Sequence, residues 1–503
     1  MNRTTTAGAA LALFLSVVAA LVVGAPTAAA ATTQGVACAS EPTYDASVPT
    51  PQSVLGFPLG MGQARVVTSE ESDRYLLAVD AASDRVESDV LATSWGGKPL
   101  RYAVVTRSDR FDANRLESIV RRIQRLRDPS STESQNATEV AETTPAIVWL
   151  AGNVHGGEKS GTDAQLRVLY ELAARTDCEV TEILDDLVVA INPTQNPDGR
   201  ELSRRQNLYG FDMNRDWFAR TQPETQGKVD LLRKLPPQVY VDAHEMGGRQ
   251  YFFPPNADPI HHEVANEVVG WINSIGEANK AAFGWNGQCR AGVTTDCFFN
   301  YDVYDLFFMG YGDSAPATGF GAAGMTYEKG SSSPTENRVD QQFRTNWATV
   351  KWASENKVKV MNEYAGLWQQ AVEEGRAGVL QPNEVLEPQN SVIWQVPDVR
   401  VRSYFFPPSR AIGDVRKLVD RLRGMDVEVY KLSKPLTIPN ARIFGGRSAN
   451  DLTVPAGTYW VPMAQAQKHW IQATLGEDPY VPFRYFYDAS TWSIPLLMGI
   501  DSL

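Results

Sequence analysis

The feature that most constrains the fold is a series of short apolar runs, each ending in a turn rich in polar residues. Residues 146–152 read Ala-Ile-Val-Trp-Leu-Ala-Gly, and such a run of large and β-branched side chains predicts a buried strand. Residues 186–191 and 238–243 repeat the pattern, and residues 160–175 have helical spacing. Strand, helix, strand in this order predicts parallel strands. We therefore predict an α/β fold with a mixed, largely parallel sheet and helices on both faces.

Histidines stand at the ends of two of these runs. The turn after residue 152 contains His155 and, three residues later, Glu158, and His244 ends the run that begins at residue 238. In open α/β sheets, ligands gather at the carboxyl ends of the strands. Together the three residues have the composition of a catalytic zinc site with two histidines and one carboxylate. A single His-x-x-Glu pair is a weak signal, because most such pairs are ordinary polar loop residues.

Composition and charge disfavour two kinds of partner. The chain has 503 residues, enough for two or three domains, and a formal net charge of −12. An acidic chain argues against nucleic acid, which requires a basic face. After the first 31 residues no stretch is long and apolar enough to span a bilayer, so we expect no stable membrane insertion.

The N-terminus is typical of a secretory signal peptide. A positive end is followed by an uncharged, mostly apolar run over residues 7–25 and by an Ala-x-Ala cleavage site. A membrane anchor is the alternative, but the run is short and ends in small residues. We predict a secreted, extracellular protein.

The rest of the chain divides by composition. We predict a signal peptide over 1–31, a flexible leader over 32–55, a catalytic domain over 56–378 and a smaller C-terminal α/β module over 385–503. The leader is polar, with Pro and Thr. The module has a strand, helix, strand pattern and no visible catalytic residues, so its role stays open. Within the domain, the Ser-, Thr- and Glu-rich residues 128–144 are expected to form a solvated loop.

Four cysteines follow the predicted signal peptide: Cys38, Cys178, Cys289 and Cys297. In an exported protein they can form two disulfides, and the sequence does not fix the pairing. A bond between Cys289 and Cys297 would close a short loop. None has the spacing of a cysteine-rich zinc site.

Residues 56–375 resemble the zinc carboxypeptidases of peptidase family M14 through ordered motifs. His155-Gly-Gly-Glu158 resembles the family's His-x-x-Glu zinc pair, and Asn-Pro-Asp-Gly at 196–199 its turn after the next strand. His244 matches the third zinc ligand. The resemblance implies a zinc-carboxypeptidase-like fold and one Zn²⁺ per chain, held by His155, Glu158 and His244.

The same resemblance implies roles for four further residues. Glu328 matches the catalytic glutamate, and Arg205 the arginine beside the developing oxyanion, although Arg204 is adjacent and would fit a register shifted by one. Asn214 and Arg215 match the pair that holds the substrate's terminal carboxylate, since a guanidinium group and a carboxylate form two parallel hydrogen bonds.

Each role has a structural alternative. Glu328 would otherwise be an exposed strand-end acid paired with Lys329. Arg205 would be a solvated arginine in a basic run. Arg215 would form an ion pair with Asp212 or Asp216. The sequence also departs from the family, because Asp216 stands where the family's Asn-Arg-Asn has its second asparagine.

A tyrosine covers the substrate in this family. Tyr311 is our candidate, Tyr301 and Tyr304 compete with it, and core packing is the alternative for each. The segment before Glu328 has no clear match to the family's specificity segment. The preferred side chain at the substrate's C-terminus therefore stays open.

We predict a secreted zinc metallocarboxypeptidase that hydrolyses the C-terminal bond of peptides with a free carboxylate. A second hypothesis keeps the zinc site but acts as an amidohydrolase or peptidase on cell-wall peptides. A third is a non-catalytic binding module on the same fold. The presence of all three zinc ligands and of Glu328 disfavours the third.

Overall fold

A seven-stranded mixed sheet, in the order β1-β2-β4-β3-β5-β7-β6, is the centre of the computed structural model. The structure describes residues 41–254, 260–283, 306–379, 384–387, 392–395, 400–409, 411–477 and 493–503. The strands are β1 (Val86–Thr93), β2 (Pro99–Val105), β3 (Ala146–Gly152), β4 (Leu187–Asn192), β5 (Val239–Met246), β6 (Tyr251–Phe252) and β7 (Ala323–Gly330). β4, β3, β5 and β7 are parallel neighbours, whereas β1, β2 and β6 pair antiparallel at the two sides. The predicted mixed α/β sheet is confirmed.

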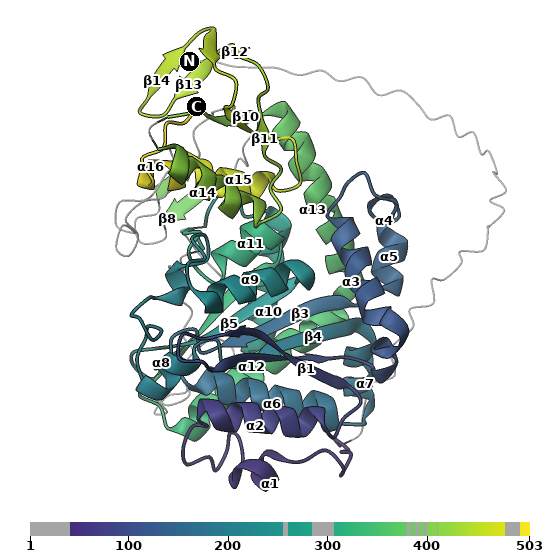
Figure 1. Ribbon diagram of the computed structural model, residues 1–503. Helices are drawn as coiled ribbons and strands as arrows, with labels where there is room; N and C mark the ends of the chain where they lie inside the picture. Colours follow the sequence, from purple (N-terminus) through teal and green to yellow (C-terminus); the bar gives the residue numbers. More distant parts are fainter. Residues whose placement is uncertain are drawn as a thin grey trace, which may run out of the picture. The chain divides into compact units, whose positions relative to one another are not determined.

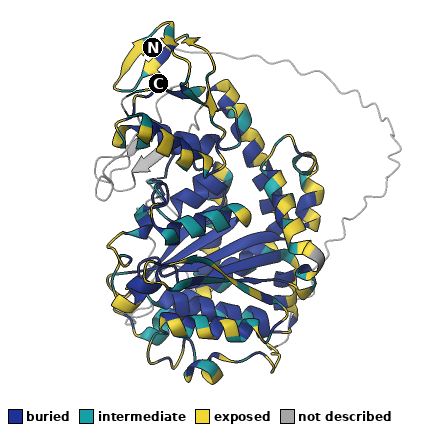
Figure 2. Cartoon of the chain, in the orientation of Figure 1, coloured by how far each residue is buried: buried dark blue, intermediate teal, exposed yellow. Residues whose placement is uncertain are grey.

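The central strands are covered on both faces. Every residue of β3 and β4 is buried, as their continuous apolar sequences require, and Figure 2 shows these strands in dark blue. In Figure 1, α2 (Ser69–Asp80) and α6 (Ser160–Ala174) lie on one face, and α9 (Pro223–Lys234) and α11 (Ser314–Phe320) on the other. The carboxyl ends of the parallel strands therefore meet at one edge of a rigid layer.

Further helices lie outside the C-terminal module. They are α1 (Pro51–Leu55), α3 (Arg115–Leu126), α7 (Cys178–Asp186), α8 (Pro197–Leu202), α10 (Asn266–Ala281), α12 (Thr335–Glu355) and α13 (Lys357–Ala377).

The expected loop over 128–144 is wrong, because it contains α4 (Thr132–Gln135) and α5 (Ala137–Thr143). Val140 and Ala141 of α5 are buried, and α5 packs against α13. The buried ammonium of Lys357 on α13 also donates to the carbonyls of Ala141 and Glu142, so apolar and polar contacts together dock this segment.

The predicted flexible leader is wrong for residues 41–55. Val48 and Leu55 are buried in the core, and the backbone N–H of Asp45 donates a 2.7 Å hydrogen bond to the carbonyl of Ala174. Composition alone does not show that these apolar side chains pack into the core. The predicted signal peptide, and the leader up to residue 40, lie outside the described residues and stay predictions.

The C-terminal module is built on a small antiparallel sheet. It consists of β10 (Ser403–Phe406), β16 (Tyr459–Pro462) and β11 (Tyr430–Lys431), with helices α14 (Ile412–Arg423), α15 (Lys468–Leu475) and α16 (Ile494–Leu497). Further short strands form three two-stranded pairs: β8 (Glu384–Glu387) with β9 (Val392–Gln395), β12 (Leu436–Ile438) with β15 (Leu452–Val454), and β13 (Ala441–Ile443) with β14 (Arg447–Ala449).

The module shares its core with the rest of the chain. Trp470 of α15 stacks on Phe218, with ring centroids 6.1 Å apart. The ammonium of Lys468 lies 2.7 Å from the carboxylate of Glu263, and both side chains are fully buried. Residues 40–503 form one compact unit, so the boundary predicted between residues 378 and 385 stays a prediction.

Two observations concern the predicted environment of the chain. Cys178, at the start of α7, is disulfide-bonded, whereas Cys38, Cys289 and Cys297 lie outside the described residues. In the described part of the chain, every helix is too short or too polar to cross a bilayer.

A buried ion pair ties the turn after β4 to α6. Arg200 of α8 lies 3.0 Å from Asp163 of α6, with exposed fractions of 1% and 0%. Arg200 also donates to the backbone carbonyl of Val67. This pair fixes the segment that runs beneath the turn carrying His155.

We expect Asp163→Asn to lower the free energy of unfolding by about 3–5 kcal/mol, because Arg200 would remain buried without its counter-charge. Urea unfolding measures the loss. Glu117→Gln is the control: it breaks an exposed pair between Glu117 and Arg121 on α3 and should cost at most about 1 kcal/mol. Equal losses in the two variants would contradict the assignment.

Candidate metal centre and active site

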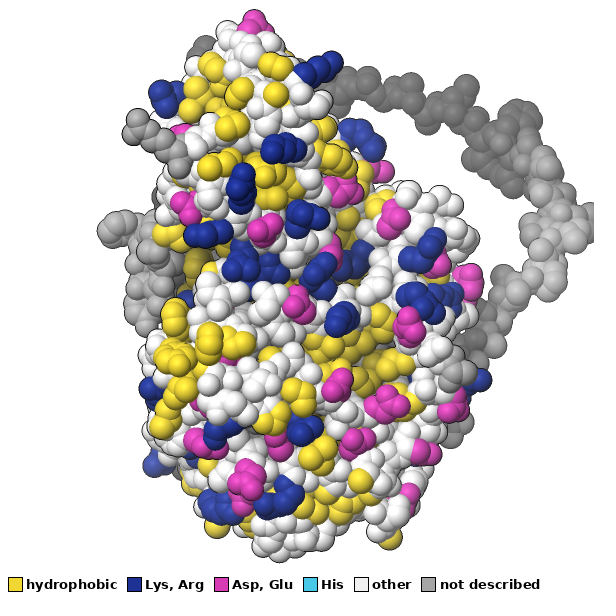
Figure 3. Space-filling model, viewed as in Figure 1, with side chains coloured by type: hydrophobic (Ala, Val, Ile, Leu, Met, Phe, Trp, Pro, Cys, Tyr) yellow, Lys and Arg dark blue, Asp and Glu magenta, His cyan; other side chains and the backbone are white. Residues whose placement is uncertain are grey.

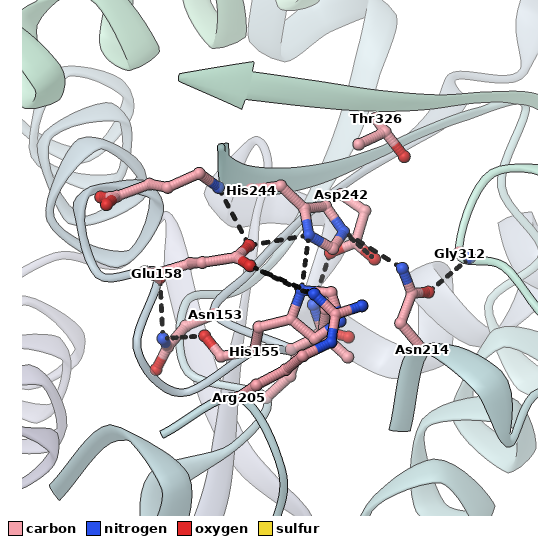
Figure 4. A network of polar contacts seen from close by, with 12 residues as sticks. Asn153, His155, Glu158, Arg205, Asn214, Asp242, His244, Gly312 and Thr326 are labelled. Atoms are coloured by element: carbon pink, nitrogen blue, oxygen red, sulfur yellow. Dashed lines mark hydrogen bonds and ion pairs between the residues drawn. The ribbon is translucent and has the colours of Figure 1, made fainter. Parts of the chain in front are cut away.

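The turn after β3 is shaped by one asparagine and one close backbone approach. Asn153 has a left-handed backbone (φ 60°), which asparagine tolerates better than most residues. Its side-chain amide donates to the carbonyls of His155 (2.9 Å) and Glu158 (2.8 Å). At Gly156 a Cβ atom would lie 2.0 Å from the carbonyl carbon of Gly199. The turn is therefore held in the shape that brings His155 and Glu158 together (Figure 4).

The three predicted ligands converge above the ends of β3 and β5 (Figure 4). Nδ1 of His155 lies 2.8 Å from Oε1 of Glu158 and 3.1 Å from Nδ1 of His244. Oε2 of Glu158 lies 2.9 Å from the same His244 nitrogen and accepts a 2.9 Å hydrogen bond from the N–H of Glu245. Within the described ranges, this is the one group of His, Cys, Asp and Glu side chains close enough to hold a metal ion.

This donor set fits a zinc ion. Tetrahedral Zn²⁺ with nitrogen ligands at about 2.0–2.1 Å places two nitrogens about 3.3 Å apart, near the 3.1 Å between the two Nδ1 atoms. Two imidazole nitrogens at this distance require a proton or a cation between them. Two nitrogens and one carboxylate also form the ligand set of many catalytic zinc sites.

The far nitrogens of both imidazoles face carboxylates. Nε2 of His155 lies 3.2 Å from Oδ1 of Asp212, and Nε2 of His244 lies 3.2 Å from Oδ2 of Asp242. Such contacts fix the tautomer and leave Nδ1 available to a metal. Asp242 is a site residue that the sequence motifs do not identify. Its spacing from His244 is the signal available, because side chains two residues apart on a strand share a face.

A buried polar chain holds Asp242 from behind. The amide of Gln195 donates to Oδ1 of Asp242 at 2.8 Å, and the ammonium of Lys228 donates to Gln195 at 2.8 Å. Lys228 is buried over the ring of Trp217, 4.0 Å from its centroid, and burial lowers the pKa of Lys228 to about 8. Asp242 is thereby kept beneath His244.

Glu328 stands beside the ligands on the neighbouring strand. It is the register partner of His244 in the pairing of β5 with β7. Its Oε2 atom is buried without a hydrogen-bond partner, and burial raises the pKa of the Glu328 carboxyl above its ordinary value. The ammonium of Lys329 instead donates to the carbonyl of Arg249. Glu328 is thus half-buried at the site and is not a solvated partner of Lys329.

Arg205 reaches the ligands and Arg204 does not. Nε of Arg205 donates to Asp212 at 2.7 Å, and its Nη1 lies 3.2 Å from Nδ1 of His155 and 3.7 Å from Oε1 of Glu158. Arg204 donates to a backbone carbonyl of its own loop. The geometry therefore places Arg205, 42% exposed, at the mouth of the site.

The short helix η3 (Met213–Arg215) presents Asn214 and Arg215. The side-chain oxygen of Asn214 accepts a 2.7 Å hydrogen bond from the N–H of Gly312, and its amide nitrogen lies 3.5 Å from Nε2 of His244. The guanidinium carbon of Arg215 lies 4.4 Å from the ring centroid of Tyr311. Asn214, Arg215 and Tyr311 are therefore neighbours beside the ligands.

Asp216, the departure from the family pattern, has a structural role. Its carboxylate accepts hydrogen bonds of 2.8–3.0 Å from the N–H and hydroxyl of Thr221 and from the N–H of Gln222. It therefore braces the loop that leads to α9. Tyr301 and Tyr304, the alternatives to Tyr311, lie outside the described residues.

Comparison with known proteins finds similarity in this region. Residues 73–282 match the zinc carboxypeptidase family, peptidase family M14. Carboxypeptidase 2 of Trichophyton rubrum is 31% identical over 121 residues, which are 24% of this chain and 22% of that protein. Human carboxypeptidase D is 32% identical over 111 residues, which are 18% of this chain and 8% of that protein. The chain thus spans about a fifth or less of the length of these relatives.

Solved structures overlap with the chain at lower similarity. A metallo-carboxypeptidase from Pseudomonas aeruginosa shares 16% identity at a TM-score of 0.41, covering 59% of this chain and 70% of that one. A metallo-carboxypeptidase from Burkholderia cenocepacia shares 14% identity at a TM-score of 0.39, covering 58% and 70%. The sequence match, and not these overlaps, carries the family assignment.

The contact between Asp242 and His244 makes a prediction about metal affinity. We expect Asp242→Asn to weaken zinc binding about 10–100-fold, as loss of a carboxylate behind a histidine ligand usually does. Competition with a chromophoric chelator measures the affinity. Asp230→Asn on α9, which removes a carboxylate that does not touch a predicted ligand, is the control, and equal affinities for the two variants would refute the role of Asp242.

Proposed function

We propose, from the premise that this chain contains a domain of the zinc carboxypeptidase family, that it hydrolyses the C-terminal peptide bond of peptides. One Zn²⁺ per chain would be held by His155, Glu158 and His244. The observation that carries the proposal is the convergence of these three side chains beside Glu328, whose inner oxygen is buried and unpaired. Export of the chain stays a prediction from its N-terminus, and the disulfide at Cys178 fits an oxidising compartment.

Zinc, when bound, polarises a carbonyl and acidifies water. Glu328 would accept the proton of the attacking water and deliver it to the leaving amine. Its position suits this work, because its Oε2 atom is buried without a hydrogen-bond partner and is free to accept a proton. Asp212 and Asp242 would keep both histidines in the orientation that directs Nδ1 to the ion.

The polar side chains around the ligands would have two roles in substrate binding and catalysis. Arg205, at the mouth of the site, would stabilise the negative charge that develops on the carbonyl oxygen, where a fixed cation matters most. Asn214 and Arg215 would bind the substrate's terminal carboxylate, which makes the enzyme an exopeptidase. Tyr311, whose ring lies over Arg215, would cover the bound residue.

The first prediction concerns the general base. We expect Glu328→Gln to lower kcat/KM for peptides about 10²–10⁴-fold while zinc remains bound, because only proton transfer is lost. Turnover is read by mass spectrometry and zinc by elemental analysis. Glu277→Gln, an exposed residue of α10, should change neither. Full activity in Glu328→Gln, or no zinc-dependent turnover in the natural protein, would sink the proposal.

The second prediction concerns the carboxylate anchor. We expect the natural protein to cleave peptides with free C-termini and to spare their amidated forms. Arg215→Met should lower kcat/KM for the free peptides roughly 10–100-fold, since a hydrogen bond to a charged group contributes about 1.5–3 kcal/mol. Arg416→Met, on the exposed face of α14, is the control. Equal cleavage of free and amidated peptides by the natural protein would exclude an exopeptidase.

A further inference from the structure

A cavity of about 290 Å³ opens between the turn that carries Arg215 and the C-terminal module. Phe218 and Phe308 contribute aromatic walls from the catalytic side. Leu497 and Met498, at the end of α16, contribute an apolar wall from the module. The cavity is slightly smaller than the roughly 300–1,000 Å³ usual for small-molecule sites. It therefore suits one large side chain better than a long segment of chain.

The charged residues that line this cavity are all basic, and one of them, Lys417, also lies 3.3 Å from the carboxylate of Asp414 on the same helix. Arg215 lines it from the catalytic side, and Lys417 and Arg421 line it from α14. None of the described residues that line the cavity carries a carboxylate. Figure 3 shows a group of Lys and Arg side chains on the face of the molecule where α14 lies. A lysine or arginine side chain entering the cavity would lose its hydration and meet charges of its own sign.

Arg215 lines the cavity and directly follows a residue of the metal centre. It follows Asn214, whose amide nitrogen lies 3.5 Å from the ring of His244. On the other wall, Gly310 lines the cavity and the next residue, Tyr311, lies over Arg215. A peptide whose terminal carboxylate is bound at Arg215 would therefore have its last side chain beside this opening.

We propose that this cavity receives the side chain of the substrate's C-terminal residue, and that α14 and α16 of the C-terminal module complete it. The module thereby acts as a specificity element that selects large apolar or aromatic residues over lysine and arginine. This inference rests on the proposed carboxypeptidase activity, which it deepens by naming the substrate class and the residues that choose it.

The charge of the rim is tested by reversal. Peptides that differ only in a last residue of Phe or Lys are compared, and the natural protein should favour Phe by at least about tenfold in kcat/KM, a difference equivalent to about 1.4 kcal/mol. Lys417→Glu combined with Arg421→Glu should reduce this ratio about tenfold. The matched control is Arg416→Glu with Arg423→Glu, two exposed residues of the same helix that do not line the cavity. An unchanged ratio in the first variant, or equal changes in both, would overturn the proposal.

The volume of the cavity is tested on α16. Leu497 and Leu496 are adjacent and similarly exposed, at 56% and 48%, but only Leu497 lines the cavity. Leu497→Trp should lower kcat/KM for Phe-terminated peptides about tenfold and spare Ala-terminated ones, because the larger ring occupies the space of the substrate side chain. Leu496→Trp should change neither, and equal effects of the two variants would refute the role of α16.

A binding measurement separates this proposal from the activity on which it rests. Saturation-transfer NMR with N-acetyl-L-phenylalanine should show binding to the natural protein, weakened in Leu497→Trp and retained in Leu496→Trp, whereas N-acetyl-L-lysine should show none. Binding of this kind without any peptide turnover would support the cavity and reject the carboxypeptidase. Peptide turnover with equal binding of both acetylated amino acids would reject the cavity alone.

Discussion

The close approach of three side chains that could hold a metal ion is the constraint on which the site depends. Two imidazole nitrogens and one carboxylate lie within about 3 Å of one another in a nearly dry environment. Such a cluster of polar side chains is stable only when the surrounding structure holds the side chains in place. Here the support comes from parallel strands that end at one edge, from a turn held by Asn153, and from carboxylates behind each histidine. The sheet and these contacts therefore hold the three side chains together.

Acidic and basic side chains contact different sides of this centre. Carboxylates of Asp212 and Asp242 lie behind the histidines, and the cation of Arg205 lies in front, near solvent. Glu328 is the exception, because its inner oxygen has no partner and burial raises its pKa. An acid left unpaired beside a cation site is free to exchange a proton, whereas an acid in a strong ion pair is not. The same fold thus provides two kinds of carboxylate, those in contact with the histidines and one whose inner oxygen is unpaired.

The C-terminal module is joined to this centre by buried polar contacts and shared packing. Arg220, four residues after Asp216, donates to the backbone carbonyls of Arg421 and Gly424 at the end of α14. Lys468 and His469 of α15 both contact the buried carboxylate of Glu263. These contacts fix the position of α14 relative to Arg215. A module held this firmly can shape a neighbouring pocket as reproducibly as the catalytic domain itself.

Much of this protein is determined by the sequence alone. The apolar runs identify β3, β4 and β5, and the motifs at their ends identify His155, Glu158 and His244, because strand character and ligand chemistry are both local properties. The tertiary structure decided what local patterns do not contain. It shows that Arg205 and not Arg204 faces the ligands, and that Asp242 supports His244. It also shows that apolar side chains of residues 41–55 and 128–144 pack into the core. It also decided that α14 and α16 wall a cavity beside Arg215. These outcomes depend on contacts between segments that are distant in the sequence. The free energy of such contacts arises from tertiary packing, which local sequence patterns do not encode.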